Sequence, residues 1–156
     1  MSPFKLNFTR KEVAVIIALC LLKLIIHLYF NLASGLHRDA YLYLAFSDHL
    51  AWGYASVPPF IGVVSWVIDL ISGESNFWAR IFPTIAGVIS VFLIAMLVKE
   101  LGGKINGILL AALAFIFSPV FLRVHSLLQP VPFDQLFWLA GTFLLVRMIN
   151  TGQLTL

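Results

Sequence analysis

Residues Val13 to Ala33 read VAVIIALCLLKLIIHLYFNLA, and this stretch decides the class of fold. It is 21 residues long, and a helix needs about 20 mostly apolar residues to cross roughly 30 Å of hydrocarbon. Basic residues precede it, as in a secretory signal peptide, but the apolar core of such a peptide has only about 7 to 15 residues. We therefore expect a membrane-spanning helix that is retained in the protein.

The composition predicts an all-α membrane protein. Of 156 residues, 61% are hydrophobic and 11% are charged, and the mean hydropathy is +0.99. Further apolar runs lie at 77–98, 105–122 and 133–149. Together with 13–33 they predict about four transmembrane helices in one membrane domain.

The charge pattern and the cysteine count exclude some kinds of site. The net charge is +3, and the basic residues form no stripe with interleaved aromatics, so nucleic acid is not an expected partner. Cys20 is the single cysteine, so it supports neither an internal disulfide nor a CxxC metal site.

Residues 34–76 are expected to form one external loop with helices that lie along the membrane. Apolar residues recur at helical spacing from Asp39 to Trp52, and aromatic residues suited to the headgroup level accompany them. A second apolar stretch, Phe60 to Ile71, has only 12 residues and is expected to be re-entrant or interfacial. The alternative, a true crossing, would place Asp39 and Asp134 on opposite sides of the membrane.

The basic residues predict the orientation. With four spans, six of them share the side of the N-terminus and three lie on the other side. The six are Lys5, Arg10, Lys11, Lys99, Lys104 and Arg147, and the three are Arg38, Arg80 and Arg123. Basic residues are enriched on the cytoplasmic side, so we expect a cytoplasmic N-terminus and an external first loop. The expected location is a bacterial inner membrane, with this loop in the periplasm.

Two polar residues interrupt the first span. Lys23 lies near its middle, and His27 follows four residues later on the same helical face. A cation at the bilayer centre costs about 2.5 to 3.5 kcal/mol on insertion scales unless it is paired, so Lys23 should face the interior of the bundle. His27 is expected to be an interior histidine with satisfied hydrogen bonds.

Two acids next to the predicted spans are candidates for chemistry. Asp39 precedes a helical pattern and can be the N-cap of that helix, a reactive carboxylate, or both. Asp134 follows two prolines at the start of the fourth span, where the helix dipole favours an acid. In the four-span topology both acids lie on the external side and can line one cavity.

Cationic side chains accompany these acids on the external side. Such groups can hold a lipid phosphate or anchor the protein to headgroups. They are His37, Arg38, Arg80, Arg123 and His125. The spacing of histidines, cysteines and acids predicts no metal site, and there is no glycine-rich phosphate loop.

An ordered series of short motifs resembles a known family over nearly the whole chain. The series is His37-Arg38-Asp39, Tyr41-Leu42, His49-Leu50-Ala51-Trp52-Gly53-Tyr54, Val57-Pro58-Pro59, Arg80, Leu101-Gly102-Gly103, Ser118-Pro119-Val120-Phe121, Gln129-Pro130-Val131 and Phe133-Asp134-Gln135-Leu136. It resembles the N-terminal part of the C-type glycosyltransferases that use polyprenyl-phosphate sugars, which include protein O-mannosyltransferases and the lipid A aminoarabinose transferase.

The resemblance implies a reaction and a site. Family members move a sugar from a lipid-phosphate carrier to an acceptor hydroxyl or amine, usually with inversion, so the implied partners are a lipid-linked sugar donor, membrane lipids and a glycan, lipid or protein acceptor. Asp39 matches the first acid of the family's loop motif, which makes it the implied general base. Substrate-binding roles are expected for His37, Arg38, Tyr41, Arg80 and Asp134.

Two departures from the family pattern are visible in the sequence. Ala40 replaces the second acid of the usual Asp-Glu pair, so a role of that acid in orienting the base or holding a divalent metal does not carry over. Family members also have many more spans, so we expect this chain to be the N-terminal part of a larger enzyme and inactive alone. The alternative is a non-catalytic membrane scaffold or subunit that uses Lys23, His27 and Asp69 as buried polar contacts.

Overall fold

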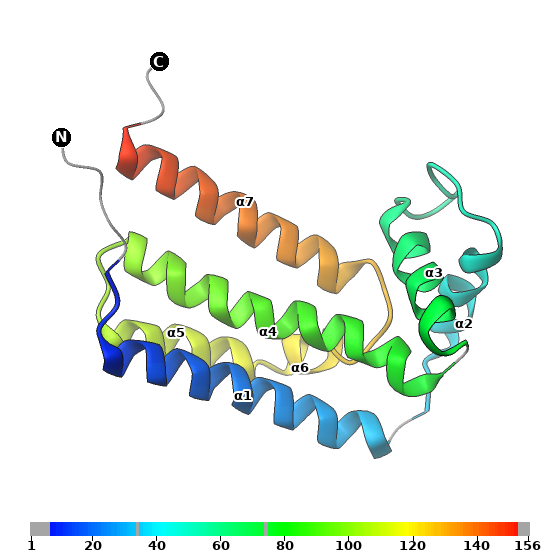
Figure 1. Cartoon of the computed structure of the whole chain (residues 1–156), viewed down its shortest axis with the longest axis horizontal. Helices are drawn as coiled ribbons and strands as arrows, with labels where there is room; N and C mark the ends of the chain where they lie inside the picture. Colours follow the sequence, from blue (N-terminus) through cyan, green and yellow to red (C-terminus); the bar gives the residue numbers. More distant parts are fainter. Residues whose placement is uncertain (1–6, 34, 74, 153–156) are drawn as a thin grey trace.

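The computed structural model describes residues 7–33, 35–73 and 75–152. All regular elements of these residues are helices. In chain order they are α1 (Arg10–Ala33), α2 (Arg38–Leu44), the 3-10 helix η1 (Ala45–Asp48), α3 (Phe60–Ser72), α4 (Asn76–Glu100), α5 (Ile105–Phe117), α6 (Pro119–Val124) and α7 (Val131–Thr151). The long helices α1, α4, α5 and α7 run side by side, and α2 and α3 gather at the end where α1 finishes and α4 begins (Figure 1).

The prediction of an all-α membrane protein is confirmed. Two helical stretches, Arg10–Leu32 and Asn76–Glu100, are long and apolar enough to cross a membrane. Both stretches leave large apolar side chains exposed, for example Ile25 at 62% and Phe92 at 46%. Such surfaces suit a hydrocarbon solvent, where an apolar exterior costs nothing.

The first helix begins three residues before the apolar run. Its start is a capping box: the Glu12 amide donates to Thr9 Oγ1 at 3.2 Å, and the Thr9 amide donates to Glu12 Oε2 at 2.9 Å. Lys23 is fully buried and His27 is 1% exposed, so the predicted inward face of the lysine is confirmed.

The helix α4 is the centre of the bundle, because α1, α3, α5 and α7 all contact it. Its buried surface is made largely of small residues, namely Ala79, Thr84, Ala86, Gly87, Ser90 and Ala95. Small residues let helix backbones approach closely in lipid. The approach is close at Gly87, where a Cβ would lie 2.7 Å from Cγ of His125.

Two ion pairs join the ends of three helices. Lys99 of α4 donates to Glu12 of α1 at 2.8 Å. The next residue, Glu100, has a fully buried side chain and accepts from Arg147 of α7 at 2.7 Å. Asn150 adds donations to the Glu100 side chain and carbonyl. We call this end of the bundle, where α1 begins and α4 and α7 finish, the basic end.

The third apolar run is not one helix. The structure breaks it at Ser118, whose backbone is extended (φ −62°, ψ 124°), and Pro119 starts α6. The prediction of a helix over 105–122 is wrong at this point, because the residue before a proline is sterically pushed out of the α region. At 13 residues, α5 is about 20 Å long and does not cross the hydrocarbon by itself.

The segment between the first two long helices also differs from its prediction. The helix expected over Asp39–Trp52 is shorter and is divided into α2 and η1, which finishes at Asp48. The chain then folds back, and Tyr54 stacks on Phe46 with 3.9 Å between ring centroids. The short apolar stretch forms α3, which packs on α2, η1 and α4 at the same end of the bundle (Figure 1).

The packing at Gly87 gives a test of the bundle. Gly87→Ala should lower the free energy of unfolding by about 1–3 kcal/mol, because the new methyl group overlaps the base of the His125 ring. Gly141→Ala is the matched control: nothing in the described structure lies within 4 Å of a Cβ there, and alanine favours the helix. Thermal unfolding in detergent, followed by circular dichroism, should separate the two variants; equal stability would contradict the close contact.

Candidate functional site

Arg80 secures the loop that leads to the candidate site. This residue lies near the start of α4 and is only 5% exposed. Its Nη2 donates to the carbonyl of Gly35, just before α2. Its Nε is buried and has no hydrogen-bond partner in the described structure. Arg80 therefore connects the loop between α1 and α2 to helix α4 of the bundle.

The helix α2 (Arg38–Leu44) is capped by His37, not by Asp39. His37 has an extended backbone, and its Nδ1 accepts from the Asp39 amide at 3.4 Å. The prediction of Asp39 as N-cap is wrong, because Asp39 lies inside the first turn. Its carboxylate instead accepts from Arg38 Nε at 3.2 Å and lies 3.5 Å from His37 Nδ1.

A contact between distant segments places Asp39 against the turn between α6 and α7. Gln129 Nε2 donates to Asp39 Oδ2 at 3.3 Å, across 90 residues of sequence. The two loops predicted to share one side thus meet in the structure. Gln129 was not among the site residues expected from sequence, although its Gln129-Pro130-Val131 motif was visible.

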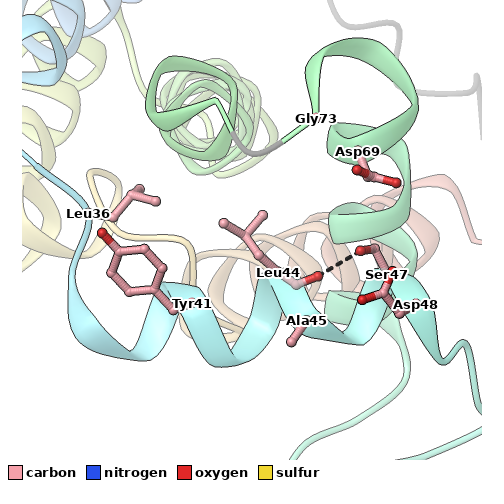
Figure 2. A pocket seen from close by; sticks show the side chains of 8 residues that line it. All are labelled: Leu36, Tyr41, Leu44, Ala45, Ser47, Asp48, Asp69 and Gly73. Atoms are coloured by element: carbon pink, nitrogen blue, oxygen red, sulfur yellow. Dashed lines mark hydrogen bonds between the residues drawn. The ribbon is translucent and has the colours of Figure 1, made fainter.

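Two other expected site residues lie apart from this contact. Asp134 is exposed in the first turn of α7. Tyr41 is 59% exposed and lines a separate cavity of about 150 Å³ between α2, η1 and α3. Figure 2 shows the acids of this cavity, Asp48 on η1 and Asp69 on α3. No basic side chain lines the cavity among the residues that the structure describes, so its charge is negative.

The packing of Ala40 explains one departure from the family pattern. Its side chain is 1% exposed and belongs to the apolar cluster between α2, α3 and α4. A carboxylate at this position would be buried among apolar groups, which costs several kcal/mol without a partner. On the same helix, burial raises the pKa of the Tyr43 hydroxyl, and the nearby charge of Asp39 raises it further.

A buried polar cluster lies inside the bundle. Lys23 Nζ donates to the carbonyl of Phe121 at 3.2 Å and lies 5.3 Å from the ring centroid of Phe115. His125 was expected among the cations of the external face, but it is fully buried, with Nδ1 2.8 Å from the Phe121 carbonyl and Nε2 3.1 Å from Gln135 Oε1. The prediction for His125 is wrong because the short helix α6 turns it inward over Gly87.

The scaffold alternative requires three buried polar residues, and the structure buries two of them. Lys23 and His27 are buried, and both make hydrogen bonds inside this chain. The expectation that His27 is fully satisfied is wrong, because its buried Nε2 has no hydrogen-bond partner in the described structure. Asp69 is exposed, so it is not a buried polar contact here. In the described ranges, no three histidine, cysteine or acidic side chains converge as metal ligands would.

Comparison with protein families shows the family to which the chain belongs. The model of the dolichyl-phosphate-mannose-protein mannosyltransferase family matches residues 56–156, which is 101 of the 156 residues. This chain belongs to that family. Membership implies a glycosyltransferase with a polyprenyl-phosphate sugar as donor. Curated proteins and solved structures gave no match.

The match divides the site of this mannosyltransferase-family chain into two parts. Arg80, Gln129 and Asp134 lie inside the matched range, whereas His37, Arg38, Asp39 and Tyr41 lie before it. The contact from Gln129 to Asp39 and the contact from Arg80 to Gly35 both cross this boundary. The matched region therefore holds the loop that precedes it in place.

The Arg80 contact predicts a local effect. Arg80→Lys should shorten the side chain and remove the donation to Gly35, so amide hydrogens of α2 should exchange faster, while those of α7 keep their rate. Arg123→Lys is the control, since Arg123 is exposed at the end of α6. Hydrogen exchange by mass spectrometry measures both; unchanged exchange in α2 would show that Arg80 does not secure the loop.

Proposed function

We propose that this chain is the membrane part of a glycosyltransferase that moves a sugar from a polyprenyl-phosphate carrier to an acceptor on the external face of the membrane. Family membership supports the reaction class and the donor class. The external placement rests on the charges. Arg10, Lys11, Lys99, Lys104 and Arg147 all lie toward the basic end, where α1 and α5 begin and α4 and α7 finish (Figure 1).

In the proposed reaction, Asp39 is the general base. Its carboxylate takes the proton of the acceptor hydroxyl or amine while the acceptor atom forms a bond to the anomeric carbon of the sugar. The bond from that carbon to the phosphate oxygen breaks, and polyprenyl phosphate leaves with the electron pair. Attack on the face opposite the phosphate inverts the anomeric configuration.

The observation that carries the proposal is the contact from Gln129 to Asp39. A general base is effective only when it is held in a fixed geometry. The amide of Gln129 holds one carboxylate oxygen at 3.3 Å, and Arg38 Nε lies 3.2 Å from the other oxygen. An acid that served only as the N-cap of a helix would need neither contact, and in α2 the N-cap is His37.

The other residues expected at the site differ in how directly they can contact a substrate. The side chain of Arg38 is 90% exposed, so it can bind the phosphate that leaves. Arg80 has one donor committed to Gly35 and a buried Nε without a partner in the described structure. His37, Tyr41 and Asp134 border the same end of the bundle, where the acceptor would approach.

The assignment of the base is tested by Asp39→Asn in the full product of the gene. Sugar transfer from a polyprenyl-phosphate donor should fall by roughly 10²- to 10⁴-fold, the usual contribution of a general base, with membrane insertion unchanged. Asp48→Asn is the matched control, because Asp48 is an exposed acid of the same loop. Near-normal transfer by the Asp39 variant would refute the assignment.

The role of Gln129 is resolved in the same assay. Gln129→Leu should lower kcat by roughly 10- to 100-fold with little change in KM, because a displaced base slows the chemical step more than binding. Gln129→Glu should lower kcat at least as much, since it places a second carboxylate against Asp39. A change in KM alone would instead assign Gln129 to substrate binding.

The proposed orientation, with a cytoplasmic N-terminus, is tested by cysteine labelling in a Cys20→Ala background. Trp52→Cys, at a position 99% exposed in the external loop, should react with a membrane-impermeant maleimide added outside. Lys104→Cys, at the basic end, should react only after the membrane is opened. For a bacterial inner membrane, spheroplasts provide the outside access; the reverse pattern would overturn the orientation.

A further inference from the structure

An apolar groove runs along the outer surface between α1 and α4. It encloses about 450 Å³, and its lining residues are apolar apart from the thiol of Cys20. They are Phe8, Val13, Ile16, Ile17, Cys20, Leu21 and Leu24 from the N-terminal side, and Val88, Phe92 and Met96 from α4. The thiol donates to the carbonyl of Val88 at 3.8 Å, so the groove offers no free polar partner at this point.

The length of the groove matches one leaflet of a bilayer. From Val13 to Leu24 the helix rises about 17 Å, at about 1.5 Å per residue. The hydrocarbon core is about 30 Å thick, so a leaflet occupies about 15 Å of it. The groove thus starts at the basic end and finishes near the bilayer centre, which is the reach of one acyl chain.

The mouth of the groove carries positive charge. Arg10 lies on the same helical face as Ile17, Leu21 and Leu24, and its side chain is exposed. Lys11 is exposed beside it. Lys99, a further cation nearby, is already paired with Glu12 at 2.8 Å. Among the residues that the structure describes, the charge available to a ligand at this mouth therefore comes from the first turn of α1.

We propose that the groove is a binding site for an anionic phospholipid of the leaflet at the basic end. One acyl chain lies between α1 and α4, and the phosphate contacts Arg10, with Lys11 adding attraction. The occupant is a lipid because the groove opens to the hydrocarbon, has the length of one acyl chain, and places cations at headgroup level. The site lies at the end of the bundle opposite Asp39, so it does not depend on the proposed reaction.

Photo-crosslinking in vesicles tests the proposal. The purified chain is placed in phosphatidylcholine vesicles that contain a few per cent of a lipid with a diazirine in the middle of one acyl chain. The probe lipid is either phosphatidylglycerol or phosphatidylcholine. Peptide mapping should show groove residues such as Leu21 and Val88 labelled several-fold more by the anionic probe, since each surface cation contributes roughly fivefold.

Three variants separate the outcomes. Arg10→Gln should reduce the anionic preference roughly fivefold, whereas Lys104→Gln, an exposed cation of the same end outside the groove, should leave it unchanged. Leu21→Trp should fill the groove and reduce labelling at Val88 by both probes. Equal labelling by the two probes, or a preference that survives Arg10→Gln, would overturn the proposal. So would crosslinks between two copies of the chain through the groove, which would assign this surface to self-association.

Discussion

The close packing of the other helices on α4 is the constraint on which this structure depends. Lipid provides no hydrophobic force between helices, so backbones must approach closely and polar groups must find partners inside the protein. Gly87 accepts the His125 ring where any side chain would collide with it. Lys99 and Glu100, adjacent on α4, then reach in different directions to join α1 and α7 by ion pairs. The small residues of α4 set the distance between the helices, and the two ion pairs fix how far each helix is shifted along its neighbour.

The end of α6 provides a hydrogen-bond acceptor for the buried lysine. Because α6 is a single short helix, the carbonyl of Phe121 lies in its last turn, where it can accept hydrogen bonds from outside the helix. Lys23 and His125 both use this carbonyl. Its backbone bond within the helix, from the His125 amide, is long at 3.4 Å, so the carbonyl remains available to the two side chains. The end of α6 thus provides an acceptor for a buried cation inside the bundle.

The two ends of the bundle have different chemistry. At the basic end, ion pairs and exposed cations suit a surface of anionic lipid. At the other end, short helices and the contact from Gln129 to Asp39 hold a carboxylate at the edge of the membrane. Arg80 links this second end to the core through Gly35. In our proposal this acid is the general base of a sugar transfer; it precedes the range that the mannosyltransferase family matches.

The sequence by itself determined the class of fold, the inward face of Lys23 and the presence of short helices between the first two spans, because hydropathy and helical spacing are local properties. It also predicted Asp39 as the residue of interest. Only the tertiary structure decided that His37 caps α2, that His125 is buried and that Gln129 contacts Asp39. These outcomes depend on which segments meet, and residues 90 positions apart meet only when small residues bring whole helices together. The hydropathy pattern of the sequence indicates which helix faces are buried. Which segment packs against each face is decided only by the packing of the whole bundle.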